Sequence, residues 1–87
     1  MTHEQDTGHE MSIEIAGFVH MPETGDYEAD CRTGHQFADA LISRMAATEF
    51  TPMLGIIVRE MVASGRWTAA HVGLFERLAN RFLVAAG

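Results

Sequence analysis

Three threonines, Thr33, Thr51 and Thr68, each precede a stretch with helical hydrophobic periodicity, and this arrangement constrains the fold more than any other feature. A threonine at an N-cap satisfies a backbone N–H that the first helical turn leaves without a partner. Thr33 is followed three residues later by Gln36, which completes the pattern of a capping box. The sequence therefore predicts three consecutive helices in the C-terminal two thirds of the chain.

The ends of these predicted helices carry further signals. The first helix should end near residues 48–50. The second has Pro52 at its first position, where the missing N–H costs nothing, and Gly65 after its last turn as a left-handed C-cap. The third should run from Thr68 to about Ala85, with Trp67 packing on Val72 as a hydrophobic staple.

The preceding residues, 12–31, show the alternation of a β-hairpin. Ser12–Val19 and Asp26–Cys31 alternate apolar and polar residues, and His20–Gly25 has the proline and glycine of a turn. Ile13, Ile15, Gly17 and Val19 share one face of the first strand. In the second strand, Tyr27, Ala29 and Cys31 are expected to face the core. The sequence thus predicts an α+β fold, an N-terminal antiparallel β-hairpin followed by three α-helices. Residues 1–11 are expected to form a flexible acidic tail, and residues 12–87 a single domain.

Charge is distributed unevenly along the chain, whose net charge is −6. Residues 1–31 hold eight carboxylates and no lysine or arginine, whereas all six arginines lie in residues 32–87. An acidic surface repels phosphate and attracts cations, so the sequence predicts a protein partner with a basic surface and no direct contact with nucleic acid. The expected partner-binding residues are Glu14, Glu23, Asp26, Glu28 and Asp30. The alternative is a solvated strand face that prevents edge-to-edge aggregation.

The third predicted helix is more apolar than a single buried face requires. Such a helix is either central to the core or shared with a second chain. A homodimer is therefore one of two expectations, with Leu74, Leu78 and Phe82 as its interface, and an intramolecular core is the other.

Residues capable of catalysis or metal binding do not form a recognisable motif. Cys31 lies beside Arg32 and before a predicted helix, which favours a thiolate, but its expected core position favours an inert thiol. No third group completes a catalytic set with His35. Cys31, His35, His20 and His71 lack the two close ligand pairs of a structural zinc site. We therefore expect no enzyme, no metal and no cofactor.

The function predicted from the sequence is non-enzymatic protein binding. In size, acidity and lack of motifs the chain resembles the small inhibitors carried by phages and mobile elements, including anti-CRISPR proteins. This resemblance implies that the chain masks a basic nucleic-acid-binding surface of a host protein. The alternative is a dimeric regulatory or DNA-associated module, in which Gly65 forms the turn of a helix-turn-helix. The single cysteine and the absence of a signal-peptide pattern or a long apolar run favour a cytoplasmic protein without a membrane span.

Overall fold

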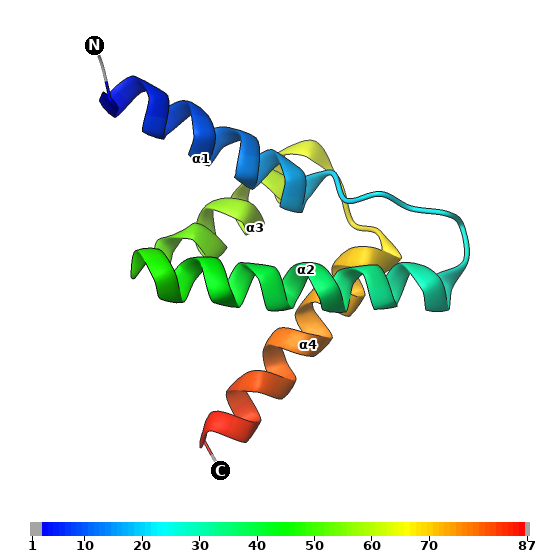
Figure 1. The fold of residues 1–87 in the computed structure, drawn as a ribbon. Helices are drawn as coiled ribbons and strands as arrows, with labels where there is room; N and C mark the ends of the chain where they lie inside the picture. The colour runs from blue at the N-terminus through cyan, green and yellow to red at the C-terminus, as the bar shows by residue number, and fades with distance from the viewer. Residues whose placement is uncertain (1–2, 87) are drawn as a thin grey trace.

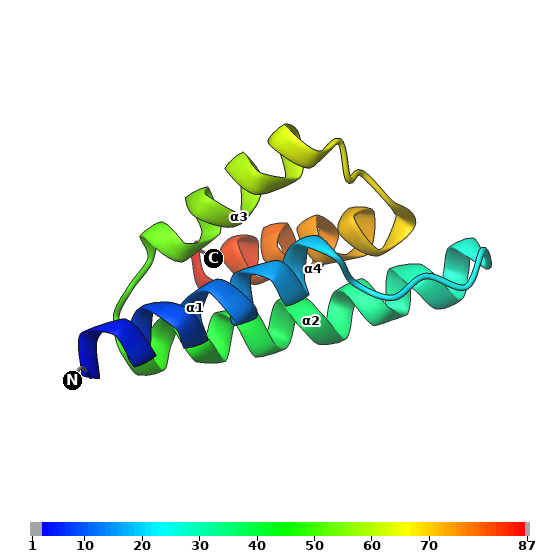
Figure 2. The ribbon, with the colours of Figure 1, turned by 90° about the horizontal axis from the view of Figure 1, so that it is seen from above.

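The computed structural model describes the backbone of residues 3–86 and the side chains of residues 11–84. Within this part of the chain the secondary structure consists of four helices: α1 (His3–Val19), α2 (Tyr27–Thr48), α3 (Pro52–Ser64) and α4 (Ala69–Ala86). The closest backbone approaches are between α2 and α4 and between α1 and α3. Figure 1 shows α1 and α3 on one side of α2, while the C-terminal half of α4 extends away on the other side. In the view from above, α1 is seen in front of α2 (Figure 2).

The predicted α+β fold is wrong, because residues 3–86 contain no β-strand. The first predicted strand belongs to α1, which also takes in residues 3–11 of the predicted tail; residues 1 and 2 lie outside the described chain. Met11, Ile15, Phe18 and Val19 have the i, i+4, i+7, i+8 spacing of an amphipathic helix and pack on the core. The alternation of residues 12–19 coincided with this helical period. Ile13, which the strand pattern placed on one face with Val19, is exposed, whereas Val19 is buried.

The second predicted strand forms the start of α2. Asp26 is the N-cap, and its carboxylate accepts hydrogen bonds from the backbone N–H groups of Glu28 and Ala29. Acidic residues in the first turn are favoured by the positive end of the helix dipole. Tyr27, predicted to be buried, is 61% exposed. It lies four residues before Cys31 on the same face of α2, but as the first residue of the helix it borders an open groove beside α4. The predicted turn at residues 20–25 does interrupt the secondary structure, but it connects two helices.

The predicted helix boundaries are confirmed where backbone geometry alone decides them. Pro52 is the first residue of α3, and Gly65 ends this helix with φ of 72°, donating its N–H to the carbonyls of Met61 and Val62. The capping box at Thr33 is wrong, because Thr33 lies inside α2 and its hydroxyl donates to the Ala29 carbonyl at 3.2 Å. An interior threonine can satisfy its hydroxyl in this way at little cost.

The crossing of α2 and α4 is built on two glycines. A Cβ added to Gly34 would overlap the backbone of Ala70 and Leu74, and a Cβ added to Gly73 would overlap the backbone of Cys31. The two helix backbones are therefore in direct contact, which only glycine permits at these positions.

The core consists of side chains from the four helices and from the loop before α2. Its fully buried large residues are Met21, Leu41, Met53, Ile57, Met61 and Leu74. Half of these are methionines, whose flexible side chains fill irregular spaces between helices that cross at wide angles. Met21 comes from the loop, so this connection is part of the core.

We predict that Gly34→Ala lowers the free energy of unfolding by about 3 kcal/mol, at the upper end of the cost of overpacking, because the added methyl group must separate two backbones. Gly55→Ala is the matched control. Gly55 is also inside a helix, has open space at its Cβ position, and should gain about 0.5–1 kcal/mol. Urea denaturation followed by circular dichroism measures both. A Gly34→Ala protein as stable as the control would contradict the crossing.

Candidate functional site

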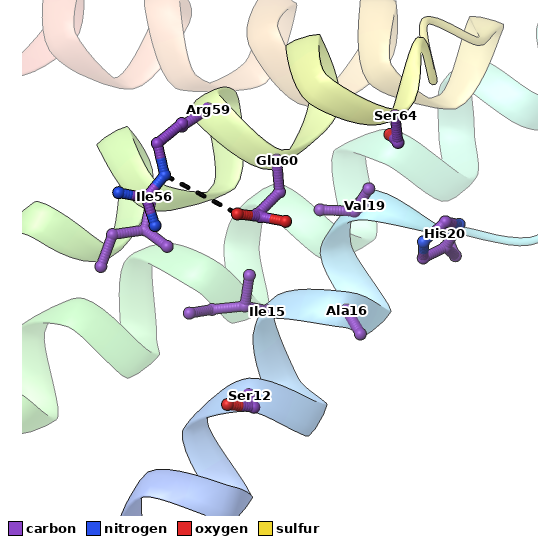
Figure 3. Close-up of a pocket in the computed structure, with 9 residues that line it drawn as sticks. All are labelled: Ser12, Ile15, Ala16, Val19, His20, Ile56, Arg59, Glu60 and Ser64. Carbon is purple, nitrogen blue, oxygen red and sulfur yellow. Dashed lines mark ion pairs between the residues drawn. The ribbon is translucent and has the colours of Figure 1, made fainter.

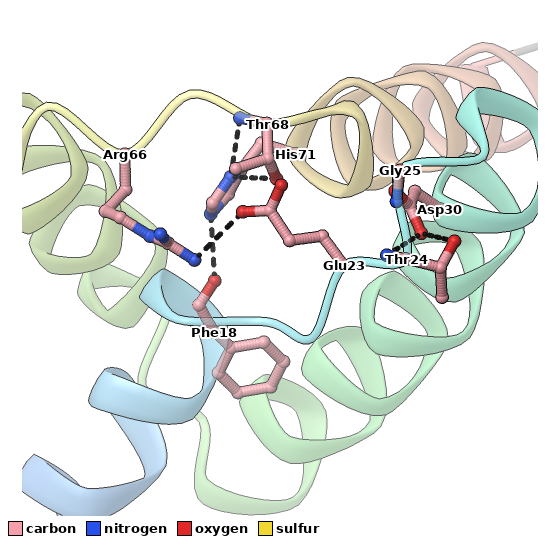
Figure 4. A network of polar contacts seen from close by, with 8 residues as sticks. All are labelled: Phe18, Glu23, Thr24, Gly25, Asp30, Arg66, Thr68 and His71. Atoms are coloured by element: carbon pink, nitrogen blue, oxygen red, sulfur yellow. Dashed lines mark hydrogen bonds and ion pairs between the residues drawn. The ribbon is translucent and has the colours of Figure 1, made fainter.

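The loop before α2 and the turn before α4 lie side by side and are joined by polar contacts (Figure 4). Arg66 Nη2 is 3.4 Å from Glu23 Oε2, and both side chains are partly exposed. Such an exposed ion pair contributes at most about 1 kcal/mol. Its effect is to hold the two connections next to each other.

His71 lies beneath this ion pair and is 1% exposed. Its Nδ1 accepts the backbone N–H of Thr68 at 3.2 Å, so the ring proton is assigned to Nε2, which donates to the Phe18 carbonyl at 3.1 Å. Burial lowers the pKa of His71, and the charge of Arg66 lowers it further. The neutral imidazole thus ties the end of α1 to the start of α4. Both ring nitrogens are occupied, so His71 is a structural residue.

Asp30 has a similar role at the start of α2. The carboxylate is 3% exposed and accepts the backbone N–H and the hydroxyl of Thr24, both at 2.9 Å, and the N–H of Gly25 at 3.2 Å. These hydrogen bonds, led by the Thr24 N–H, lower the pKa of Asp30. Asp30 therefore folds the loop onto α2 and is not available to a partner.

The other predicted partner-binding residues fall at two places. Glu23, Asp26 and Glu28 surround the start of α2, and of these the Glu28 carboxylate is exposed and has no ion-pair partner among the described side chains. Glu14 lies apart on α1, where its Oε2 is 2.9 Å from Arg44 Nε of α2. The structure therefore brings three of the five predicted residues together at the start of α2, but Glu23 is paired with Arg66 and Asp26 caps the helix, so within residues 11–84 Glu28 is the one of the three with a free carboxylate.

The histidines and the cysteine considered for catalysis or zinc binding are not brought together. Cys31 is buried and its thiol donates to the Ala69 carbonyl at 3.5 Å, while His35 Nε2 lies 3.4 Å from Glu76. No group of three or more His, Cys, Asp or Glu side chains within residues 11–84 is placed to hold a metal ion.

An apolar groove of about 610 Å³ lies beside the acidic start of α2. Its walls include Tyr27 of α2, Trp67 of the turn, and Val72, Phe75 and Glu76 of α4; we call it the aromatic groove. The indole of Trp67 stacks on Phe75 with ring centroids 6.4 Å apart and stays 58% exposed. Trp67 and Val72 line the same groove, and the predicted staple between them stays a prediction. Sequence inspection missed this site, because Tyr27 is distant in the sequence from the other lining residues, which lie within residues 67–76.

A second groove, of about 320 Å³, lies between α1 and α3 (Figure 3). Its lining mixes apolar residues, such as Ile15 and Ile56, with polar ones. Arg59 Nε lies 3.7 Å from the carboxylate of its neighbour Glu60, so the two charges offset each other along α3. This groove presents neither an aromatic surface nor an excess of one charge.

The residues predicted as an oligomer interface are divided by the fold. Leu74 and Leu78 are buried within the chain, whereas Phe82 is exposed. The helix-turn-helix alternative places its reading helix at α4, but Ala70, Gly73 and Leu74 of its first turns are buried against α2 or the core. The start of α4 therefore cannot present these positions to a DNA groove.

No protein-family model, no curated protein and no solved structure matches the chain. Among the helices described, none combines the length and the apolar character needed to cross a membrane.

We predict that the free energy of unfolding falls as the pH is lowered from 7 toward 5. The unfolded chain takes up a proton on His71 near the ordinary pKa of about 6.5, whereas the folded protein, with its lowered pKa, takes it up only at lower pH. The contribution of neutral His71 to the free energy of unfolding is therefore fully present above the ordinary histidine pKa and is lost progressively as the pH falls below it. Urea titrations at successive pH values measure the slope.

His71→Gln should flatten this slope, whereas His20→Gln, at an exposed loop position, should leave it unchanged. A His71→Gln protein that keeps the full wild-type slope would show that His71 is not the responsible group.

Proposed function

We propose that this chain is a small, acidic, non-enzymatic protein-binding module whose aromatic groove receives a basic segment of a partner protein. The observation that supports this proposal is an exposed aromatic surface next to an excess of negative charge. Trp67 and Tyr27 line an apolar groove and are 58% and 61% exposed. Large aromatic side chains are usually buried, and exposed apolar patches often mark binding sites.

The charge around the aromatic groove determines the chemistry of the proposed occupant. Residues 23–32 and 66–76 contain five carboxylates against two arginines, and one of these arginines, Arg66, is paired with Glu23. Glu76 stands at the groove itself with its side chain 61% exposed. An arginine or lysine of a partner would gain a carboxylate and the face of an aromatic ring at the same time. The apolar remainder of the groove would take the neighbouring apolar side chains.

The structural roles of the other reactive groups also support a binding function. His71, Asp30 and Cys31 direct their polar atoms to the protein's own backbone or to the hydroxyl groups of Thr24 and Thr68. A basic segment of the kind that contacts nucleic acid would be masked while it occupies the groove. A free buried thiol suits the reducing cytoplasm that we propose as the location.

Trp67 is the single tryptophan of the chain, so its fluorescence reports on the groove directly. The probe is a synthetic peptide of alternating arginine and leucine, and its matched control has glutamate in place of arginine. We expect the arginine peptide to shift the emission of Trp67 and to saturate, because it carries both the charge and the apolar groups that the groove accepts. The glutamate peptide should produce no shift.

Tyr27→Ala should weaken binding of the arginine peptide about tenfold, the effect of truncating an aromatic anchor that contributes 1–2 kcal/mol. Val62→Ala removes a similarly exposed apolar side chain on α3 and should bind like wild type. Equal binding of the two peptides, or no loss of affinity on Tyr27→Ala, would refute the proposal.

A further inference from the structure

The C-terminal part of α4 extends away from the other helices, as Figure 1 shows, and Leu78 is the last buried residue among the described side chains of α4. Three consecutive large apolar residues on this segment, Phe82, Leu83 and Val84, are 63%, 73% and 72% exposed. Residues two apart on a helix differ by about 200° around its axis, so Phe82 and Val84 face nearly opposite directions. The apolar surface therefore surrounds the end of this helix instead of forming one stripe.

A groove of about 590 Å³ lies between the end of α2 and this part of α4, and we call it the distal groove. Ile42 and Met45 of α2 and Leu78 of α4 line it, and Phe82 forms one wall. The protein thus has an apolar recess directly beside an apolar protrusion. Surfaces of this size that stay uncovered are typical of interfaces.

We propose that the occupant of the distal groove is a second copy of this chain, related to the first by a two-fold axis. In such a dimer the same patch serves both copies, so each must carry a recess and a matching protrusion. The α4 end of one copy would enter the distal groove of the other, and the two α4 ends would pack together. This arrangement covers Phe82 on the groove side and Val84 on the opposite side, which a segment lying in the groove alone would not do.

The distribution of charge supports a second copy over a basic partner at this position. Two copies with a net charge of −6 repel each other, but the residues after Glu76 include two arginines and no carboxylate. The distal groove has one charge of each sign at its rim, Glu49 and Arg81. Arg81 Nη2 is 3.1 Å from Asp39 of its own chain, and its remaining N–H groups can reach the Glu49 carboxylate of the second copy.

The dimer is tested first by sedimentation equilibrium on the full chain. We expect wild type to sediment at twice the monomer mass of 9.6 kDa, and Phe82→Asp/Leu83→Asp at 9.6 kDa with unchanged helicity, because both side chains are exposed. Val62→Asp places the same charge on an exposed valine of α3 and should remain dimeric. A monomeric wild type at every concentration, or a doubly substituted protein that still dimerises, would overturn the proposal.

Charge exchange tests the two-fold arrangement itself. Glu49→Arg places two like-charged pairs in its own dimer, and Arg81→Glu does the same with opposite sign, so each variant alone should raise the dimer dissociation constant at least tenfold. Mixing the two variants makes both rim pairs complementary and should restore a dimer. If the mixture stays as weak as its components, the proposed pairing is wrong. The two grooves share no lining residue, so this result and that of the peptide titration are independent.

Discussion

The direct contact between the backbones of α2 and α4 determines most of what this protein presents to its surroundings. Because Gly34 and Gly73 lack a Cβ, the two helices cross without side chains between them. Interaxial distances between packed helices depend on the side chains at the contact, and glycine allows the shortest. The crossing lies in the first half of both helices, so their remaining turns diverge. The distal groove opens where they separate, and the exposed end of α4 lies beyond it.

The positions of the buried polar residues His71 and Asp30 depend on the same crossing. A helix that starts so close to α2 brings its first turn under the loop that leaves α1, and His71 fills this junction as a neutral, doubly hydrogen-bonded ring. Asp30 folds the loop back onto α2. The hydrogen-bonding atoms of His71 and Asp30 are therefore occupied in connecting elements of the protein itself. Available chemistry therefore remains in the aromatic groove and the carboxylates around it, and this supports binding rather than catalysis as the proposed function.

The sequence was informative where one residue determines the backbone. Pro52 and Gly65 marked the ends of α3 correctly, because each restricts or permits a backbone angle regardless of tertiary contacts. The sequence was misleading at residues 12–31, where short apolar runs fit both a two-residue and a 3.6-residue period, and only tertiary packing decides between them. The acidic start of α2 was visible as charge. Its position beside Trp67 was not, because Tyr27 and Trp67 are brought to one groove only by the α2–α4 crossing.

The most direct test of this crossing is a nuclear Overhauser experiment on the isotopically labelled protein. The structure predicts cross-peaks between the α-protons of Gly34 and the protons of Ala70 and Leu74, and between those of Gly73 and Cys31, since a Cβ at either glycine would overlap these neighbours. Cross-peaks between these three residue pairs would place the two backbones in contact. Their absence from a folded, fully assigned protein, with side-chain contacts separating α2 from α4, would contradict the account.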